Sequence, residues 1–64
     1  MATLGEKFDE VKRTGNARLA GQIADFLRFK HGFNYNDVAA MAQRHGIDAD
    51  TWEALQYEAD AEGV

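Results

Sequence analysis

The chain has 64 residues and a net charge of −4, and this length fits one domain near the lower limit for independent folding. Without cysteine it can form neither a disulfide nor a thiolate zinc site, so its stability has to come from packing. No apolar run approaches the roughly 18 residues of a membrane span, and the N-terminus lacks the basic-then-apolar order of a signal peptide, which predicts a soluble cytoplasmic protein.

Composition favours helix along the whole chain. Proline is absent, and residue types with high helix propensity such as Ala, Leu, Glu and Arg are abundant. We therefore predict an all-α fold, a single domain over residues 1–64. Its four short helices should form a small bundle and span about 3–14, 17–31, 35–45 and 49–61.

The first two predicted helices each have one apolar face and end at a glycine. In the first, Leu4, Phe8 and Val11 recur at i, i+4 and i+7, and the pattern stops at the turn T-G-N of residues 14–16. In the second, apolar residues occupy one face and Gly32 follows the last helical residue. The residues of that face are Leu19, Ala20, Ile23, Phe26 and Leu27.

The third and fourth predicted helices begin with the same signal, a capping residue that follows an apolar one. Asn34 can cap the third helix, with Asp37 at its third position and Phe33 packing onto Val38. At the start of the fourth helix, Asp48 is the capping residue, and Ile47 before it can pack onto Trp52.

The apolar faces predict one hydrophobic core. Burying each large side chain contributes about 1.5–3 kcal/mol before conformational entropy is subtracted, which supports one small bundle. The predicted core residues are Leu4, Phe8, Val11, Leu19, Ile23, Phe26, Leu27, Val38, Met41, Ala42, Ile47, Trp52 and Leu55.

Charge is distributed unevenly along the chain. Residues 1–36 contain six basic and four acidic residues, a net charge of +2. Residues 37–64 contain one basic residue, Arg44, and seven acidic ones, a net charge of −6, and the two sums give the −4 of the whole chain. Phosphate backbones should be repelled by the acidic half.

Two stretches, FLRFKHGFNYNDV from residue 26 and AQRHGIDADTWEAL from residue 42, resemble the Cro and phage-repressor type of helix-turn-helix. In that family a small residue precedes the turn glycine by four positions, as Ala42 precedes Gly46. Apolar residues follow the glycine at one, six and nine positions, as Ile47, Trp52 and Leu55 do. The resemblance implies a DNA-binding regulator, with a dimer as one form that it can take. Its DNA contacts would come from Arg44, Thr51, Lys12, Arg13 and Arg18.

The sequence departs from this family in two respects. The segment between Asn34 and Gly46 is about three residues longer than the family pattern. At the exposed start of the would-be recognition helix stand Ala49, Asp50, Thr51 and Glu53, where the family uses Gln, Ser, Arg or Lys. Because phosphate contacts need cations, the scaffold can resemble the family while the DNA-binding chemistry is lost.

The same region also resembles a ubiquitin-associated three-helix bundle. The Met-Gly-Phe loop of that family corresponds to His31-Gly32-Phe33, and its later loop to residues 46–48. Here His replaces the Met, and Trp52 is bulky where that family has a small residue. This resemblance implies a protein-binding module.

Neither histidine predicts a catalytic or metal site. His31 and His45 each stand just before a helix-ending glycine, where a dipole partner or a half-buried ring is the simpler interpretation. Asp48 and Asp50 could form a carboxylate pair, but one of them is the predicted cap. The sequence has no phosphate-binding glycine loop, nucleophile elbow or HExxH pair, so we predict no enzyme, no metal and no cofactor.

The fourth predicted helix carries the most specific functional signal. Six carboxylates and no cation lie between residues 48 and 64, and such an array can imitate nucleic-acid phosphates. Phe29, Tyr35 and Tyr57 have no obvious place in the core, which favours an interface, although Phe29 could meet the first helix. The predicted partner-binding residues are Asp48, Asp50, Glu53, Tyr57, Glu58, Asp60, Phe29 and Tyr35.

We therefore predict a small inhibitor that binds another protein with a basic, nucleic-acid-handling surface. In size and charge the chain resembles the anti-restriction and anti-CRISPR proteins that mobile elements encode. Nucleic acid is a partner only under the Cro-like alternative, no membrane is involved, and a homodimer is possible.

Overall fold

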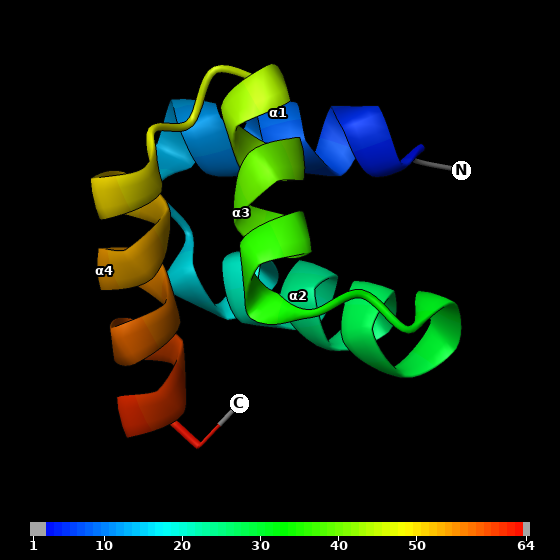
Figure 1. Cartoon of the computed structure of the whole chain (residues 1–64). Coiled ribbons are helices and arrows are strands. Elements are labelled where there is room, and N and C mark those ends of the chain that lie inside the picture. Colours follow the sequence, from blue (N-terminus) through cyan, green and yellow to red (C-terminus); the bar gives the residue numbers. More distant parts are fainter. Residues whose placement is uncertain (1–2, 64) are drawn as a thin grey trace.

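A computed structural model describes residues 3–63 of the chain and has four helices: α1 (Leu4–Thr14), α2 (Ala17–His31), α3 (Tyr35–Arg44) and α4 (Ala49–Ala61) (Figure 1). The predicted small all-α bundle is confirmed, and the helix bounds differ from the predicted ones by one residue at two ends. Thr3 is the N-cap of α1, and His45 is the C-cap of α3. Among the described residues no helix has the length and apolar character that crossing a membrane requires.

All four helices begin at a hydrogen-bonded cap, and the caps predicted at Asn34 and Asp48 are confirmed. Thr3 and Asn16 cap α1 and α2 by accepting from the backbone N–H three residues later, each at 3.2 Å. At α3 the predicted capping box is complete, because Asn34 and Asp37 each accept from the other's backbone N–H. These bonds satisfy helix N–H groups that have no partner within the helix.

Helix α2 is the centre of the bundle and packs against each of the other three helices. In Figure 1, α1 and α2 cross behind the two ends of α3, and α4 stands beside them. Four of the six buried residues of α2 are small, and small residues allow two helix backbones to approach closely. The small buried residues of α2 are Ala17, Ala20, Gly21 and Ala24.

The core agrees with the predicted set except at its margin. Phe8, Trp52 and Ala42 are fully buried, and Leu4, Leu19 and Met41 are only partly buried. The prediction for Phe26 was wrong, because its side chain is 46% exposed. Phe26 lines an open groove between α1 and α2, together with Leu4 and Leu19, so its ring stays accessible to solvent. The buried residues that the predicted core omitted are Ala17, Ala20, Gly21, Ala24 and Ala59.

Candidate partner-binding surface

The exposed surface of α4 and its two caps, Asp48 and Glu62, is strongly acidic. Residues 48–63 contain six carboxylates and no lysine or arginine, and all six carboxylates are exposed. Within residues 3–63 the only ion pair joins Arg13 Nη2 to Glu10 Oε1, at 3.5 Å. No contacting cation of the described chain therefore compensates this charge. The six residues are Asp48, Asp50, Glu53, Glu58, Asp60 and Glu62.

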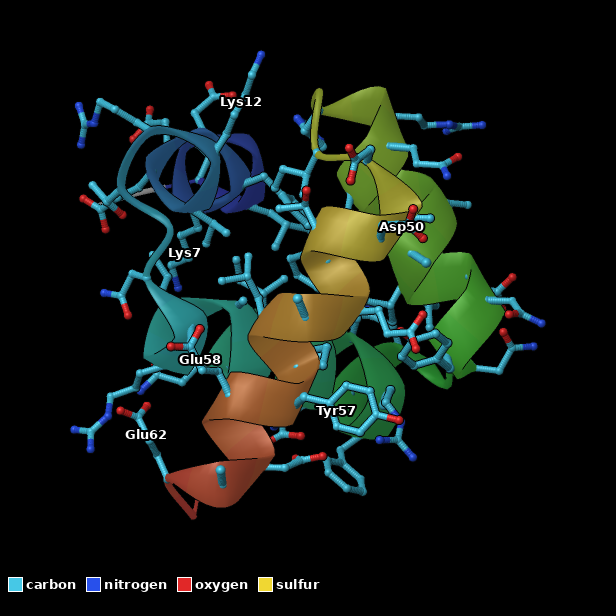
Figure 2. The ribbon with its side chains drawn as sticks, turned by 90° about the vertical axis from the view of Figure 1, so that its left-hand side faces the viewer. Lys7, Lys12, Asp50, Tyr57, Glu58 and Glu62 are labelled. Atoms are coloured by element: carbon cyan, nitrogen blue, oxygen red, sulfur yellow. The ribbon has the colours of Figure 1, made fainter. Side chains whose placement is uncertain are left out.

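Helical periodicity divides the acidic surface into two edges. On one side of the buried face lie Glu53, Tyr57 and Asp60, at i, i+4 and i+7. On the other side lie Glu58 and Glu62, and Figure 2 shows both pointing to the opposite side of α4 from Tyr57. A single flat partner surface cannot contact both edges equally.

A cleft opens where the first edge meets the start of α3. It is lined by Tyr35 of α3 and by Glu53, Gln56, Tyr57 and Asp60 of α4, and we call it the tyrosine cleft. Both tyrosines offer accessible surface, since Tyr35 is 45% and Tyr57 is 71% exposed. The tyrosine cleft thus combines two aromatic rings with two unpaired carboxylates.

Hydrogen bonds hold both walls of the tyrosine cleft in place. The capping box, with Asp37 N donating to Asn34 Oδ1 at 2.9 Å, fixes the start of α3 and so places Tyr35 as its first residue. On the other wall, Gln56 Nε2 donates to the carbonyl oxygen of Ala20 at 3.0 Å and links α4 to α2. The walls come from separate helices, so the geometry of the cleft depends on the packing of the whole bundle.

The electrostatics of the tyrosine cleft disfavour further negative charge. The pKa of Tyr35 is raised above its ordinary 10.0, first by partial burial, then by the negative charge of Glu53, then by Tyr57. Burial disfavours any charge, but the negative charge of Glu53 that disfavours the phenolate also favours a cation. The chemistry of the cleft therefore suits a cationic group.

The structure brings together half of the predicted partner-binding set. Asp48 is the N-cap of α4, and its carboxylate accepts from Thr51 N at 2.7 Å. Hydrogen bonds to the side chain and backbone of Thr51 lower the pKa of Asp48. Asp50 lies in the first turn of α4, and Glu58 lies on the opposite edge. The predicted residues that line the tyrosine cleft are Tyr35, Glu53, Tyr57 and Asp60.

Phe29 lies outside the tyrosine cleft, near the C-terminal end of α2. Its side chain is 79% exposed, so it does not pack on α1, and the Arg28 guanidinium lies 5.9 Å from the centroid of its ring. Gln56, by contrast, was absent from the predicted set although it lines the cleft. Its position next to the buried face suggested only packing, and nothing in the sequence pairs it with α2.

The residues implied by the DNA-binding alternative do not form one group. Lys12 and Thr51 line a common depression beside the turn between α3 and α4, together with the capping carboxylate of α4. Arg44 lines a separate depression along α3, and Arg13 forms its ion pair with Glu10 within α1. Arg18 is exposed in the first turn of α2.

Both histidines make aromatic contacts. His45 is half-buried and stacks on Phe8, with ring centroids 4.8 Å apart and planes within 5°. His31 meets Phe26 and Phe33 edge-on, at 5.2 and 6.3 Å between centroids. Over residues 3–63, no group of three or more His, Asp or Glu side chains is arranged to hold a metal ion.

Comparison of the chain with protein-family models, with curated proteins and with solved structures gives no significant match.

Proposed function

We propose that this chain is a small, non-enzymatic inhibitor that binds another protein through α4, with the edge at the tyrosine cleft contacting a basic, nucleic-acid-handling surface. The observation that supports this most is the unpaired charge of α4: six exposed carboxylates, no contacting cation within residues 3–63, and two exposed tyrosines beside them. Such a surface is complementary to a protein that carries positive charge to bind phosphates.

A helix with carboxylates along one edge can occupy a groove built for a phosphate backbone. Glu53 and Asp60 are seven residues apart, so their Cα atoms are about 10 Å apart along the helix axis. Both anions can therefore meet cations of one groove at the same time. Exposed charges of this kind raise association rates and are screened by salt.

The two tyrosines can supply binding affinity that exposed carboxylates alone do not. Exposed ion pairs contribute little affinity each, whereas tyrosine rings are enriched among residues that dominate binding energy at interfaces. Tyr57 is 71% exposed and stands between Glu53 and Asp60 on the same edge. A partner that covers this edge buries aromatic surface and pairs charge in one contact.

A second candidate, a Cro-like DNA-binding regulator, is favoured by the packing of the residues that carry the resemblance. Ala42 and Trp52 are fully buried, and Ile47 and Leu55 are 3% and 8% exposed. Gly46 has a φ of 88°, as a turn glycine between two helices can adopt. The first turn of α4, however, presents carboxylates where a phosphate backbone requires cations.

Two assays separate these candidates. In a gel-shift assay at low salt, the wild-type protein should not retard generic duplex DNA. In an affinity capture, the immobilised protein should retain one or more proteins from a lysate. Duplex DNA added as a competitor should elute them, because it occupies the same basic surface. The double variant Glu53→Lys, Asp60→Lys should lose this retention, and the control Glu58→Lys, Glu62→Lys, with the same change of charge on the other edge, should lose much less.

Retardation of the duplex by the wild-type protein would contradict the proposal and favour the regulator. Equal retention by the wild-type protein and both double variants would contradict it as well, because α4 would then take no part in binding. Because the four substituted side chains are exposed, the variants should fold like the wild-type protein. Far-UV circular dichroism checks this.

A further inference from the structure

We infer that the tyrosine cleft is a receptor for one arginine side chain of the partner, which would stack on Tyr57 and form hydrogen bonds with a neighbouring carboxylate. This inference rests on the proposed function and specifies the chemistry that the cleft recognises. It concerns the edge of α4 that faces α3 and does not involve Glu58 or Glu62.

The aromatic part of this receptor is free. Among residues 3–63 the only guanidinium or ammonium placed over an aromatic ring is that of Arg28, over Phe29. Neither Tyr35 nor Tyr57 has such a partner, although both rings are exposed beside carboxylates. A cation over a tyrosine face is attracted by the ring quadrupole, by about 0.5–1 kcal/mol at exposed sites.

The carboxylates are spaced to serve a cation that lies on Tyr57. Glu53 precedes Tyr57 by four residues and Asp60 follows it by three, and both spacings place side chains next to each other on a helix. A group stacked on the Tyr57 ring therefore has a carboxylate within reach toward either end of α4. A charge-assisted hydrogen bond to one of them fixes the orientation of the group.

Arginine fits this arrangement better than lysine. A guanidinium is flat and weakly hydrated, stacks on aromatic faces, and presents a fork of N–H donors to a carboxylate. A lysine ammonium is compact and strongly hydrated, and it has neither a plane that can lie flat on a ring nor a fixed fork of donors that matches a carboxylate. Since Tyr35 closes the cleft from the side of α3, the cleft is bounded by rings on two sides.

The test uses three short synthetic peptides that differ at one position, which is arginine, lysine or citrulline, in an otherwise Gly- and Ser-containing sequence. Titration of the full-length ¹⁵N-labelled protein is followed by NMR. The arginine peptide should shift amide signals around residues 35 and 53–60. The lysine peptide should bind several-fold more weakly, and the neutral citrulline peptide should not shift these signals.

Variants assign the contacts. Tyr57→Leu keeps an apolar side chain at an exposed position. It should lower the affinity for the arginine peptide about two- to fivefold, which is the cation–π contribution expressed as an affinity ratio. Glu53→Gln should weaken it by a salt-dependent factor of similar size. Glu58→Gln removes one charge from the opposite edge and should change the affinity much less.

Equal affinity for arginine and lysine peptides, together with no effect of Tyr57→Leu, would overturn the inference. The cleft would then be only a negatively charged surface, and the proposed function would stand if the lysine double variant still abolished capture. Failure of the proposed function is recognised separately, because capture would then not depend on the charge of α4.

Discussion

Replacing Gly46 with alanine tests the turn that sets α4 against α3. Gly46 has a φ of 88°, which side chains rarely adopt. An added Cβ would lie 2.6 Å from Lys12 Nζ and 3.0 Å from Lys12 Cε. The substitution therefore combines a backbone strain with a displacement of the Lys12 side chain.

The backbone strain and the displacement of Lys12 both lower stability. A residue with a Cβ in the left-handed region costs about 1–2 kcal/mol, and the stiffer unfolded chain returns about 0.4–1 kcal/mol. Lys12 is exposed, but it lines a depression together with Val11 and Ile47, so moving its stem also disturbs apolar contacts. The net backbone cost is about 1 kcal/mol, and with the displacement of Lys12 we expect Gly46→Ala to lower the free energy of unfolding by about 1–2 kcal/mol. Tm falls by about 4–8 °C per kcal/mol in a domain of this size.

Gly32→Ala is the matched control, because Gly32 has a φ of 68° and nothing within 4 Å of an added Cβ. Urea unfolding of both variants should show the larger loss for Gly46→Ala. In a Lys12→Ala background the difference between the two glycine sites should shrink, which a double-mutant cycle measures. A Gly46→Ala protein as stable as wild type would refute the turn geometry and, with it, the placement of α4 beside Tyr35.

Three further predictions concern single side chains. In a Tyr57→Phe background, ultraviolet titration should give a Tyr35 pKa above 10.0, and adding Glu53→Gln should lower this pKa. Because folding raises the pKa of Tyr35, the free energy of unfolding should fall as pH rises above 10.0. Asp48 has a lowered pKa, so its capping contribution, present above pH 3.8, should be lost as pH falls through the folded-state pKa, and acid unfolding of Asp48→Asn should lack this component. Urea unfolding should show that Trp52→Phe lowers the free energy of unfolding by about 1 kcal/mol, against about 3–5 kcal/mol for Trp52→Ala. The phenylalanine variant loses little because the buried indole Nε1 has no hydrogen-bond partner. A loss of stability as large as that of the alanine variant would contradict this reasoning.

The helices could be predicted because their ends depend on local chemistry. Each start has a capping side chain, and Gly15, Gly32 and Gly46 have positive φ at the ends of α1, α2 and α3. The buried arc of α2 could not be predicted in full, because it depends on which helix covers it. Phe26 is more apolar than Ala20, yet Ala20 is fully buried because α4 packs there.

The tyrosine cleft shows the same division between local and global information. The order Glu53, Tyr57, Asp60 along one edge of α4 follows from the 3.6-residue period, and the exposure of Tyr57 could be expected from it. The presence of Tyr35 opposite this edge could not, since it depends on how α3 packs against α4. The role of Gln56 was hidden for the same reason, because its acceptor lies 36 residues away in α2.

The two longest helices of the chain end with opposite charge. The last turn of α2 carries Arg28, Lys30 and His31, which suit the negative end of the helix dipole. Residues 58–62, the last turn of α4 and its C-cap Glu62, carry three carboxylates, and this turn has no basic residue. Each such anion near a helix C-terminus is unfavourable by about 0.3–1 kcal/mol. Since the same chain complements the dipole of α2, overall composition does not explain the end of α4. Under the proposed function a cationic partner provides the missing positive charge, so binding recovers stability that the free domain lacks at this helix end.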